Sequence, residues 1–221
     1  FMLFAMLSNA GWYMVSGVGV YYFDVVIGDP GKQSAFNLLG AVGSVLGLVV
    51  VPLLTKVTTR RRTYQISLLL AIFGFIGMSV AIKSTGSFLL MNLCYLVASI
   101  GVASMFVQQT VFLADIVDYG EVKQGFRSES ITFSMKGFLQ KMAYTIQTII
   151  LFSGLEISHY NENLHAQNAE EVKNAISFMM LVAPIILIIL SLIVYTTKFK
   201  LHGKFMEEIT AHPADAISTS E

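Results

Sequence analysis

The chain has 221 residues, of which 55% are hydrophobic and 13% are charged, and its formal net charge is +0. Soluble domains carry about 25% charged residues, so this composition excludes an ordinary soluble domain and predicts a membrane protein. We expect a lipid bilayer as its surroundings, with no nucleic-acid partner, no metal and no resident cofactor.

Six apolar runs are long enough to cross a bilayer as helices, which takes about 20 residues each. In chain order they cover residues 1–27, 36–54, 64–82, 88–113, 130–153 and 174–197. The runs are continuous and contain glycine and proline, as membrane helices do. The sequence therefore predicts an all-α membrane protein with six transmembrane helices over residues 1–203, followed by a polar, disordered cytoplasmic tail, 204–221.

The basic residues are distributed unevenly between the two sides that these six runs would create. One side carries only Lys32, Lys83 and Lys173. The other carries Lys56, Arg60, Arg61, Arg62, Lys123, Arg127, Lys198, Lys200 and Lys204. Because cytoplasmic connections are rich in lysine and arginine, we expect the second side, and both ends of this segment, to be cytoplasmic in a multi-pass protein of the cell membrane.

The first run begins at Phe1, without an initiator methionine, and lacks the basic leader of a signal peptide. We therefore expect the chain to be the back part of a longer protein. The acidic connection 154–173 contains His159 and His165, but their irregular spacing favours a solvated loop over a metal site.

Lys141 lies near the middle of the fifth run. A charge at the centre of a membrane helix costs about 2.5 to 3.5 kcal/mol on insertion scales and usually marks a substrate or ion path. Its helical face is shared by Ser134, Gly137, Thr145 and Thr148. This polar face favours a cavity-lining helix over a structural ion pair. Lys136, roughly 7.5 Å nearer to the cytoplasm, can line the cavity or extend to the interface.

Polar and aromatic residues of the fourth and first runs have two interpretations, contact with a ligand and simple helix packing. Phe106 precedes Gln108 and Gln109 in the fourth run. An aromatic ring there can stack on a sugar, and glutamines in hydrocarbon usually face protein or water. Simple helix packing explains these residues equally well, and the same holds for Trp12 and Tyr13 of the first run.

A charged segment, Ala114-Asp-Ile-Val-Asp-Tyr-Gly-Glu-Val-Lys-Gln-Gly-Phe-Arg-Ser-Glu-Ser130, leads into the fifth run. It resembles the loop between helices ten and eleven of the glycoside-pentoside-hexuronide:cation symporter family, to which melibiose permease belongs. Tyr21-Tyr-Phe-Asp-Val-Val-Ile-Gly28 resembles the family's seventh helix, and residues 52–62 its basic loop between helices eight and nine. The resemblance covers residues 1–203 and implies the C-terminal half, helices 7–12, of a twelve-helix major facilitator fold.

The resemblance implies half of a secondary active transporter that imports a glycoside or other sugar in symport with Na+ or H+ by alternating access. The N-terminal six-helix half would be its partner and would supply most of the groups that bind the coupling ion. The positions expected beside the sugar are Lys141, Lys136, Gly137, Gln140 and Phe106. Lys136 stands where melibiose permease has a neutral amide, and Phe106 where it has tryptophan. These departures weaken the expectation of a galactoside. If Lys136 lines the cavity, a second cation there favours an anionic sugar such as a uronide, and if Lys136 extends to the interface this reason is removed.

The charged segment also resembles the family's cytoplasmic gate, whose ion pairs hold one state and break in the other. The expected gate consists of Asp115, Asp118, Tyr119, Glu121, Arg127, Glu129, Arg61 and Arg62, beside Arg60.

Two alternatives differ in their chemistry. A lysolipid:cation symporter shares the fold and would need a lateral opening to lipid. A membrane enzyme would use Lys141 as a Schiff base or Asp115 and Asp118 in an active-site loop. The six runs, with the lysine on the fifth, do not resemble seven-helix retinal proteins, so we expect a transporter and no enzyme.

Overall fold

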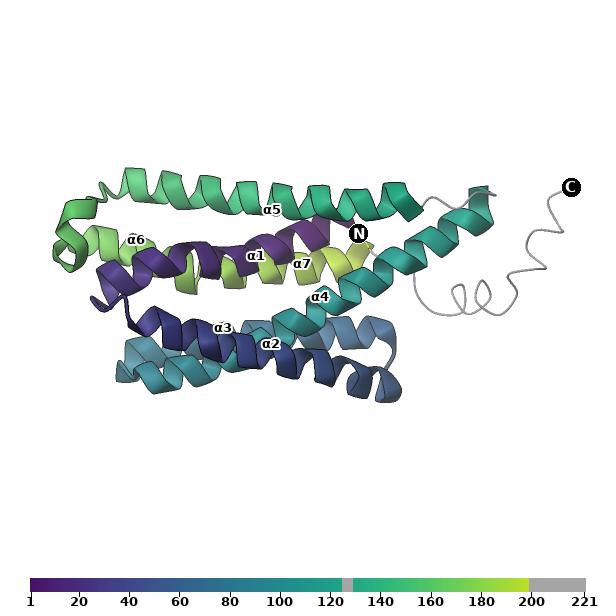
Figure 1. The fold of residues 1–221 in the computed structure, drawn as a ribbon, viewed down its shortest axis with the longest axis horizontal. Coiled ribbons are helices and arrows are strands. Elements are labelled where there is room, and N and C mark those ends of the chain that lie inside the picture. The colour runs from purple at the N-terminus through teal and green to yellow at the C-terminus, as the bar shows by residue number, and fades with distance from the viewer. Residues whose placement is uncertain (125–128, 199–221) are drawn as a thin grey trace, which may run out of the picture.

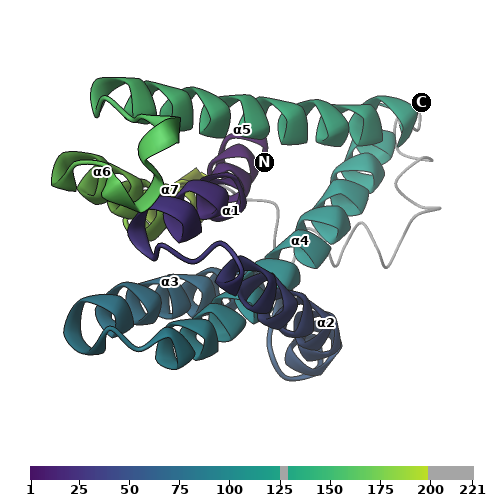
Figure 2. The same ribbon diagram turned by 60° about the vertical axis from the view of Figure 1, so that its left-hand side comes forward.

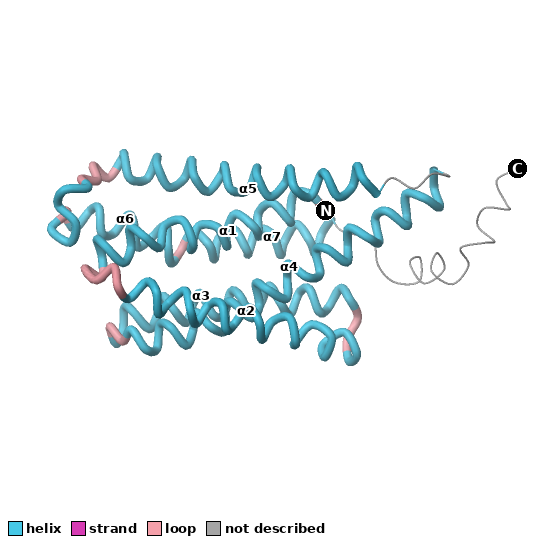
Figure 3. Tube along the Cα trace, viewed as in Figure 1, coloured by secondary structure: helices cyan, strands magenta, loops and turns pink. Residues whose placement is uncertain are grey.

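The computed structural model describes residues 1–124 and 129–198, and its regular structure there is helical (Figure 1). Short connections join the helices (Figure 3). Expectations for Arg127 and for the tail 204–221 lie outside the described residues. In chain order the elements are α1 (Met2–Tyr21), a π-helical turn (Tyr22–Val26), α2 (Lys32–Val57), α3 (Arg60–Thr85), α4 (Phe88–Gln124), α5 (Glu129–Ile157), a 3₁₀ turn (Glu162–Gln167), α6 (Glu170–Leu181) and α7 (Ala183–Lys198).

Within the described ranges, five helical segments are long and apolar enough to cross a membrane, so this part of the chain is that of an all-α, multi-pass membrane protein. They are Met2–Val26, Lys32–Val57, Arg60–Ser84, Phe88–Glu121 and Glu170–Thr197. The fifth expected span forms α5, whose 29 residues provide sufficient length. It is not among the five, and Lys136, Gln140 and Lys141 are polar residues that reduce its apolar character.

Two details differ from the boundaries expected from the sequence. The last expected span is divided at Val182 into α6 and α7, just before Pro184. The charged segment expected to be a loop is helical as far as Gln124, because α4 continues for 37 residues. A helix of that length extends about 55 Å, well beyond a hydrocarbon core of about 30 Å. Figure 1 shows the end of α4 projecting past its neighbours.

Local signals fix several helix ends. Thr59 precedes α3, and its side chain accepts a hydrogen bond from the backbone N–H of Arg62, as a helix cap does. At the other end, Gly86 adopts a left-handed conformation with φ 59°, which a glycine reaches without steric cost. These two ends hold the connections short, so that α3 lies antiparallel to both α2 and α4.

Glycines allow α2, α3 and α4 to pack closely. A Cβ added to Gly43 on α2 would lie 2.6 Å from the carbonyl oxygen of Leu96 on α4. One added to Gly74 on α3 would lie 2.6 Å from the Cα of Ala98, also on α4. Real Cβ atoms do not approach so closely, which explains why the Gly-x-x-x-Gly spacing of Gly43 and Gly47 serves helix contact.

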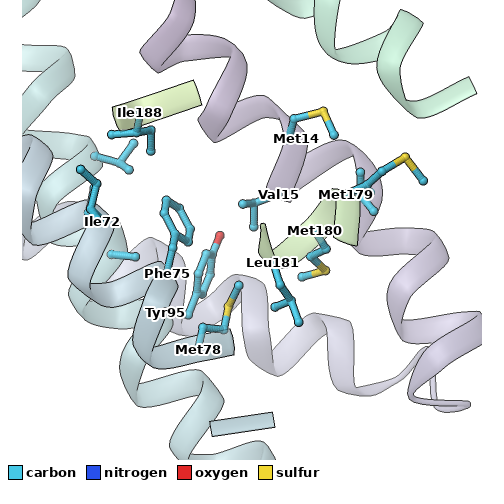
Figure 4. Packing of buried hydrophobic residues seen from close by; sticks show 14 of the residues in the cluster. Met14, Val15, Ile72, Phe75, Met78, Tyr95, Met179, Met180, Leu181 and Ile188 are labelled. Carbon is cyan, nitrogen blue, oxygen red and sulfur yellow. The ribbon is translucent and has the colours of Figure 1, made fainter. Parts of the chain in front are cut away.

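The core lies where α1, α3, α4 and the α6–α7 pair meet. Figure 4 shows Phe75 and Met78 of α3 beside Tyr95 of α4, with Val15 of α1 and Leu181 of α6 approaching from the other side. All five side chains are buried in one cluster. This core leaves α5 at one edge of the bundle and α2 with α3 at the other, with α4 rising between them towards the start of α5 (Figures 1 and 2).

Candidate functional site

Lys141 lies on a side of α5 that the bundle does not cover. The buried stripe of α5 consists of Leu139, Ala143, Gln147, Leu151 and Leu155. Lys141, Ser134 and Thr145 are exposed, and a Cβ added to Gly137 would meet nothing within 4 Å. Within the described part of the chain, the Lys141 ammonium makes no hydrogen bond or ion pair. Three residues of the expected polar face are therefore exposed, as are the apolar Phe138 and Tyr144 of the same helix, and a role of this face in lining a cavity stays a prediction.

Lys136 points elsewhere, towards α4. Its Nζ donates a hydrogen bond of 2.6 Å to Oγ1 of Thr110. The Thr110 hydroxyl in turn donates to the backbone carbonyl of Phe106, one turn earlier, at 3.2 Å. Five residues of an α-helix turn by about 140°, so Lys136 and Lys141 lie on different faces of α5. The structure joins Lys136 to Phe106 and keeps Lys141 apart from them.

A groove of about 280 Å³ opens beside Phe106, between α1, α2 and α4. Trp12 forms its α1 wall and stacks on Tyr95, with ring centroids 6.0 Å apart and planes at 7°. The full lining is Trp12, Ser44, Val45, Leu48, Val102, Ala103, Phe106 and Val107. Two aromatic side chains from different helices therefore share one groove.

Trp12 and Thr110 belong to this region, but the sequence did not single them out as site residues. Trp12 is the chain's one tryptophan and lies in an apolar run, a signal that also fits packing. Thr110 carried no signal, because its partner Lys136 is 26 residues away on another helix. Gln140 is half-buried on α5, and its side chain makes no hydrogen bond with the described residues.

The two glutamines of α4 face protein, as expected. Gln109 donates to the Ser8 hydroxyl at 3.1 Å and lies 3.5 Å from the Tyr64 hydroxyl. Gln108 donates to the Ser67 hydroxyl at 3.1 Å. These bonds join α4 to α1 and α3 within the same turn of α4 that carries Phe106 and Thr110.

The start of α3, the end of α4 and the start of α5, which carry most of the described residues of the expected gate, lie towards one end of the bundle (Figure 1). Arg60 Nη1 lies 2.6 Å from Asp115 Oδ1, an ion pair between α3 and α4. Arg61 donates to the carbonyl oxygen of Thr196 on α7 at 3.3 Å. Of the remaining expected members, Asp118, Tyr119 and Glu121 are half-buried, and Arg62 and Glu129 are exposed.

The described acidic residues lie near helix ends or in the connections between helices. The sequence has no aspartate or glutamate between residues 30 and 114 or between 130 and 155. Lys136 and Lys141 therefore have no acid beside them along the apolar parts of this chain.

A histidine–aspartate pair lies away from the expected gate, where His165 lies 2.9 Å from Asp24. In the described ranges no three His, Cys, Asp or Glu side chains are grouped to hold a metal ion.

A multi-pass helical bundle with a polar helix face and charged residues near one end fits a membrane transporter. Residues 1–203 match the family described as MFS/sugar transport protein, and the chain belongs to this family of transporters.

Several proteins named as symporters, transporters or carriers are similar to this chain. The uncharacterized symporter YjmB of Bacillus subtilis is 26% identical over 216 residues, covering 94% of this chain and 45% of that protein. The isoprimeverose transporter of Lactiplantibacillus pentosus is 31% identical over 178 residues, covering 77% and 35%. The glucuronide carrier protein homolog of Escherichia coli is 28% identical over 152 residues, covering 68% and 33%. The chain thus spans less than half the length of these relatives.

Proposed function

We propose that this chain is the C-terminal six-helix half, helices 7–12, of a secondary active transporter. The transporter imports a glycoside or other sugar in symport with Na+ or H+. The observation that carries this proposal is the polar face of α5, where the exposed Lys141 has no acidic partner among the described residues. An intramembrane ammonium needs a partner or water, and a second helical half across a wet cavity supplies both.

The proposed sugar site lies between that face and α4. Phe106 offers a ring for stacking, and Lys136, held by Thr110, offers donors for a hydroxyl or carboxylate. Gly137 leaves room beside them, because nothing lies within 4 Å of its added Cβ. Gln140 lies one turn from Lys136 on the same helix and supplies an amide to the same region.

Lys141 acts electrostatically in this proposal. It pairs with carboxylates of the N-terminal half, and that half also supplies most of the groups that bind the coupling ion. Loading or releasing a cation changes the charge that Lys141 faces, and this links ion binding to the sugar region. The clustered charges around Arg60 and Asp115 form the cytoplasmic gate, so the basic end of the bundle and both ends of this segment are cytoplasmic.

The names of the relatives favour a sugar over a lysolipid as substrate. The isoprimeverose transporter and the glucuronide carrier homolog are both named for carbohydrate cargo. No described feature of the bundle favours a lipid-facing entrance.

Uptake by the complete transporter tests the proposal. We would reconstitute it in liposomes and measure entry of radiolabelled methyl glycosides and uronides with a Na+ gradient, an H+ gradient or neither. Gradient-dependent accumulation is expected for at least one sugar. Uptake that ignores both gradients contradicts symport, and accumulation of lysolipid in place of every sugar contradicts the substrate class.

A further inference from the structure

The groove beside Phe106 differs chemically from the sugar region next to it. Of its lining residues, only Ser44 has a hydroxyl, and that hydroxyl already donates to the carbonyl oxygen of Gly40 at 2.9 Å. The remaining surface is aromatic or aliphatic, apart from the indole N–H of Trp12. A sugar ring carries hydroxyls on most of its carbons, and burying them without partners is costly. The groove therefore does not suit the sugar ring itself.

The Trp12 wall of the groove is held rigidly. Trp12 stacks on Tyr95, and Tyr95 stacks on Phe36 with ring centroids 3.7 Å apart and planes at 12°. Tyr95 and Phe36 are buried, whereas Trp12 is only half-buried and keeps part of its surface on the groove. A flat ring presented from a fixed stack binds another flat apolar group at little entropic cost.

Phe106 connects the groove to the polar cluster. Its side chain lines the groove, and its backbone carbonyl accepts the Thr110 hydroxyl that holds Lys136. A ligand that lies along α4 meets hydrogen-bond donors at the Lys136 end and apolar walls at the Trp12 end. This polarity matches a molecule with a hydroxylated part joined to an apolar part.

We propose that the Trp12 groove is a subsite for the apolar aglycone of a glycoside, with the sugar ring placed at Phe106, Thr110 and Lys136. The inference rests on the proposed sugar transport and adds the class of glycoside: one carrying an aryl or other flat apolar group. Trp12 is the specificity-determining residue of this subsite, because it supplies the stacking surface.

The test uses the complete transporter and pairs of competitors that share one sugar. Phenyl and methyl glycosides are compared as inhibitors of radiolabelled methyl glycoside uptake. Burial of a phenyl ring in the groove should make the phenyl compound about tenfold more potent. Trp12→Ala should bring the ratio of the two inhibition constants close to one, whereas Trp12→Phe should retain most of it.

A groove-filling variant gives a second measurement. Leu48 lines the groove and is 55% exposed, and Leu46 on the same helix is 43% exposed and outside it. Leu48→Trp should abolish the phenyl preference, and Leu46→Trp should keep it. Equal inhibition by both glycosides in the unmodified protein overturns the aglycone subsite, and so does a preference that survives both Trp12→Ala and Leu48→Trp. Failure of all sugar uptake would instead contradict the proposed transport.

Discussion

Lys136 on α5 and Thr110 on α4 are joined by a hydrogen bond of 2.6 Å, and this bond directs one of the two α5 lysines towards Phe106. Lys141, five residues further on, has no such partner among the described residues. The same helix thus carries one lysine held by its own bundle and one left open for another partner.

Lys136 should determine how well the transporter accepts a negative charge on the sugar. We expect Lys136→Gln to lower the uptake of a uronide relative to the matching neutral glycoside by about tenfold, because a charge-assisted hydrogen bond is lost. Competition between the two sugars measures this ratio. Lys83→Gln, an exposed lysine at the opposite end of the bundle, is the matched control. An unchanged ratio would show that Lys136 does not contact the substrate.

Thr110→Val should weaken the placement of Lys136 while preserving side-chain shape. The valine cannot accept the Lys136 hydrogen bond, so the ammonium loses its fixed position. We expect KM for the sugar to rise several-fold with a smaller change in maximal rate. The substitution weakens the binding of the sugar and leaves the later conformational steps of transport largely unchanged. Thr110→Ser, which restores a hydroxyl, should recover the original KM. If serine and valine behave alike, the hydroxyl has no positioning role.

Lys141→Gln should abolish gradient-driven accumulation without unfolding the protein. Its ammonium makes no hydrogen bond or ion pair with the described residues, so the packing of these helices does not depend on it, and the purified variant should keep its helical circular dichroism spectrum. Coupling should fall by at least about a hundredfold, as expected when a buried carboxylate loses its cation. Uptake with and without the ion gradient measures coupling. Normal accumulation by this variant would contradict the proposed electrostatic link.

Arg60 and Asp115 should contribute to the transport cycle more than to stability. The Arg60 side chain is 61% exposed and that of Asp115 is 16% exposed, so the pair stabilises the fold by only about 0 to 1 kcal/mol. Arg60→Asp places like charges together and should slow uptake several-fold. The double reversal, Arg60→Asp with Asp115→Arg, should restore most of the rate. If it does not, the residues act independently rather than as a gate pair.

Gly74→Leu should destabilise the contact between α3 and α4. The added side chain would meet the backbone of Ala98, which cannot move aside as a flexible side chain can. We expect a loss of about 1 to 3 kcal/mol, as for other overpacked positions, measured by thermal unfolding in detergent. Gly137→Ala is the control, because its Cβ would enter open space. Equal stability of the two variants would show that α3 and α4 can separate without cost.

The sequence determined that this chain is a bundle of membrane helices and that Lys141 stands on a polar helix face. Both follow from properties that are local along the chain: apolar runs of sufficient length, and the periodicity that places Ser134, Lys141 and Thr145 on one side of a helix. The match of residues 1–203 to a transporter family agrees with that interpretation. Local patterns could not show that the charged segment continues α4, because its polarity fits a loop and an extramembrane helix equally well.

Only the tertiary structure decided which residues meet across helices. Lys136 could line a cavity or reach the interface, and its bond to Thr110 depends on how α4 rises beside α5. Trp12 could be simple packing, and its place in the groove depends on the Tyr95 stack beneath it. Helix periodicity fixes the direction in which a side chain points around the axis of its helix. The neighbour it meets is set by how the helices pack against one another, for example at the glycine contacts between α2 and α4, and sequence spacing alone does not specify that packing.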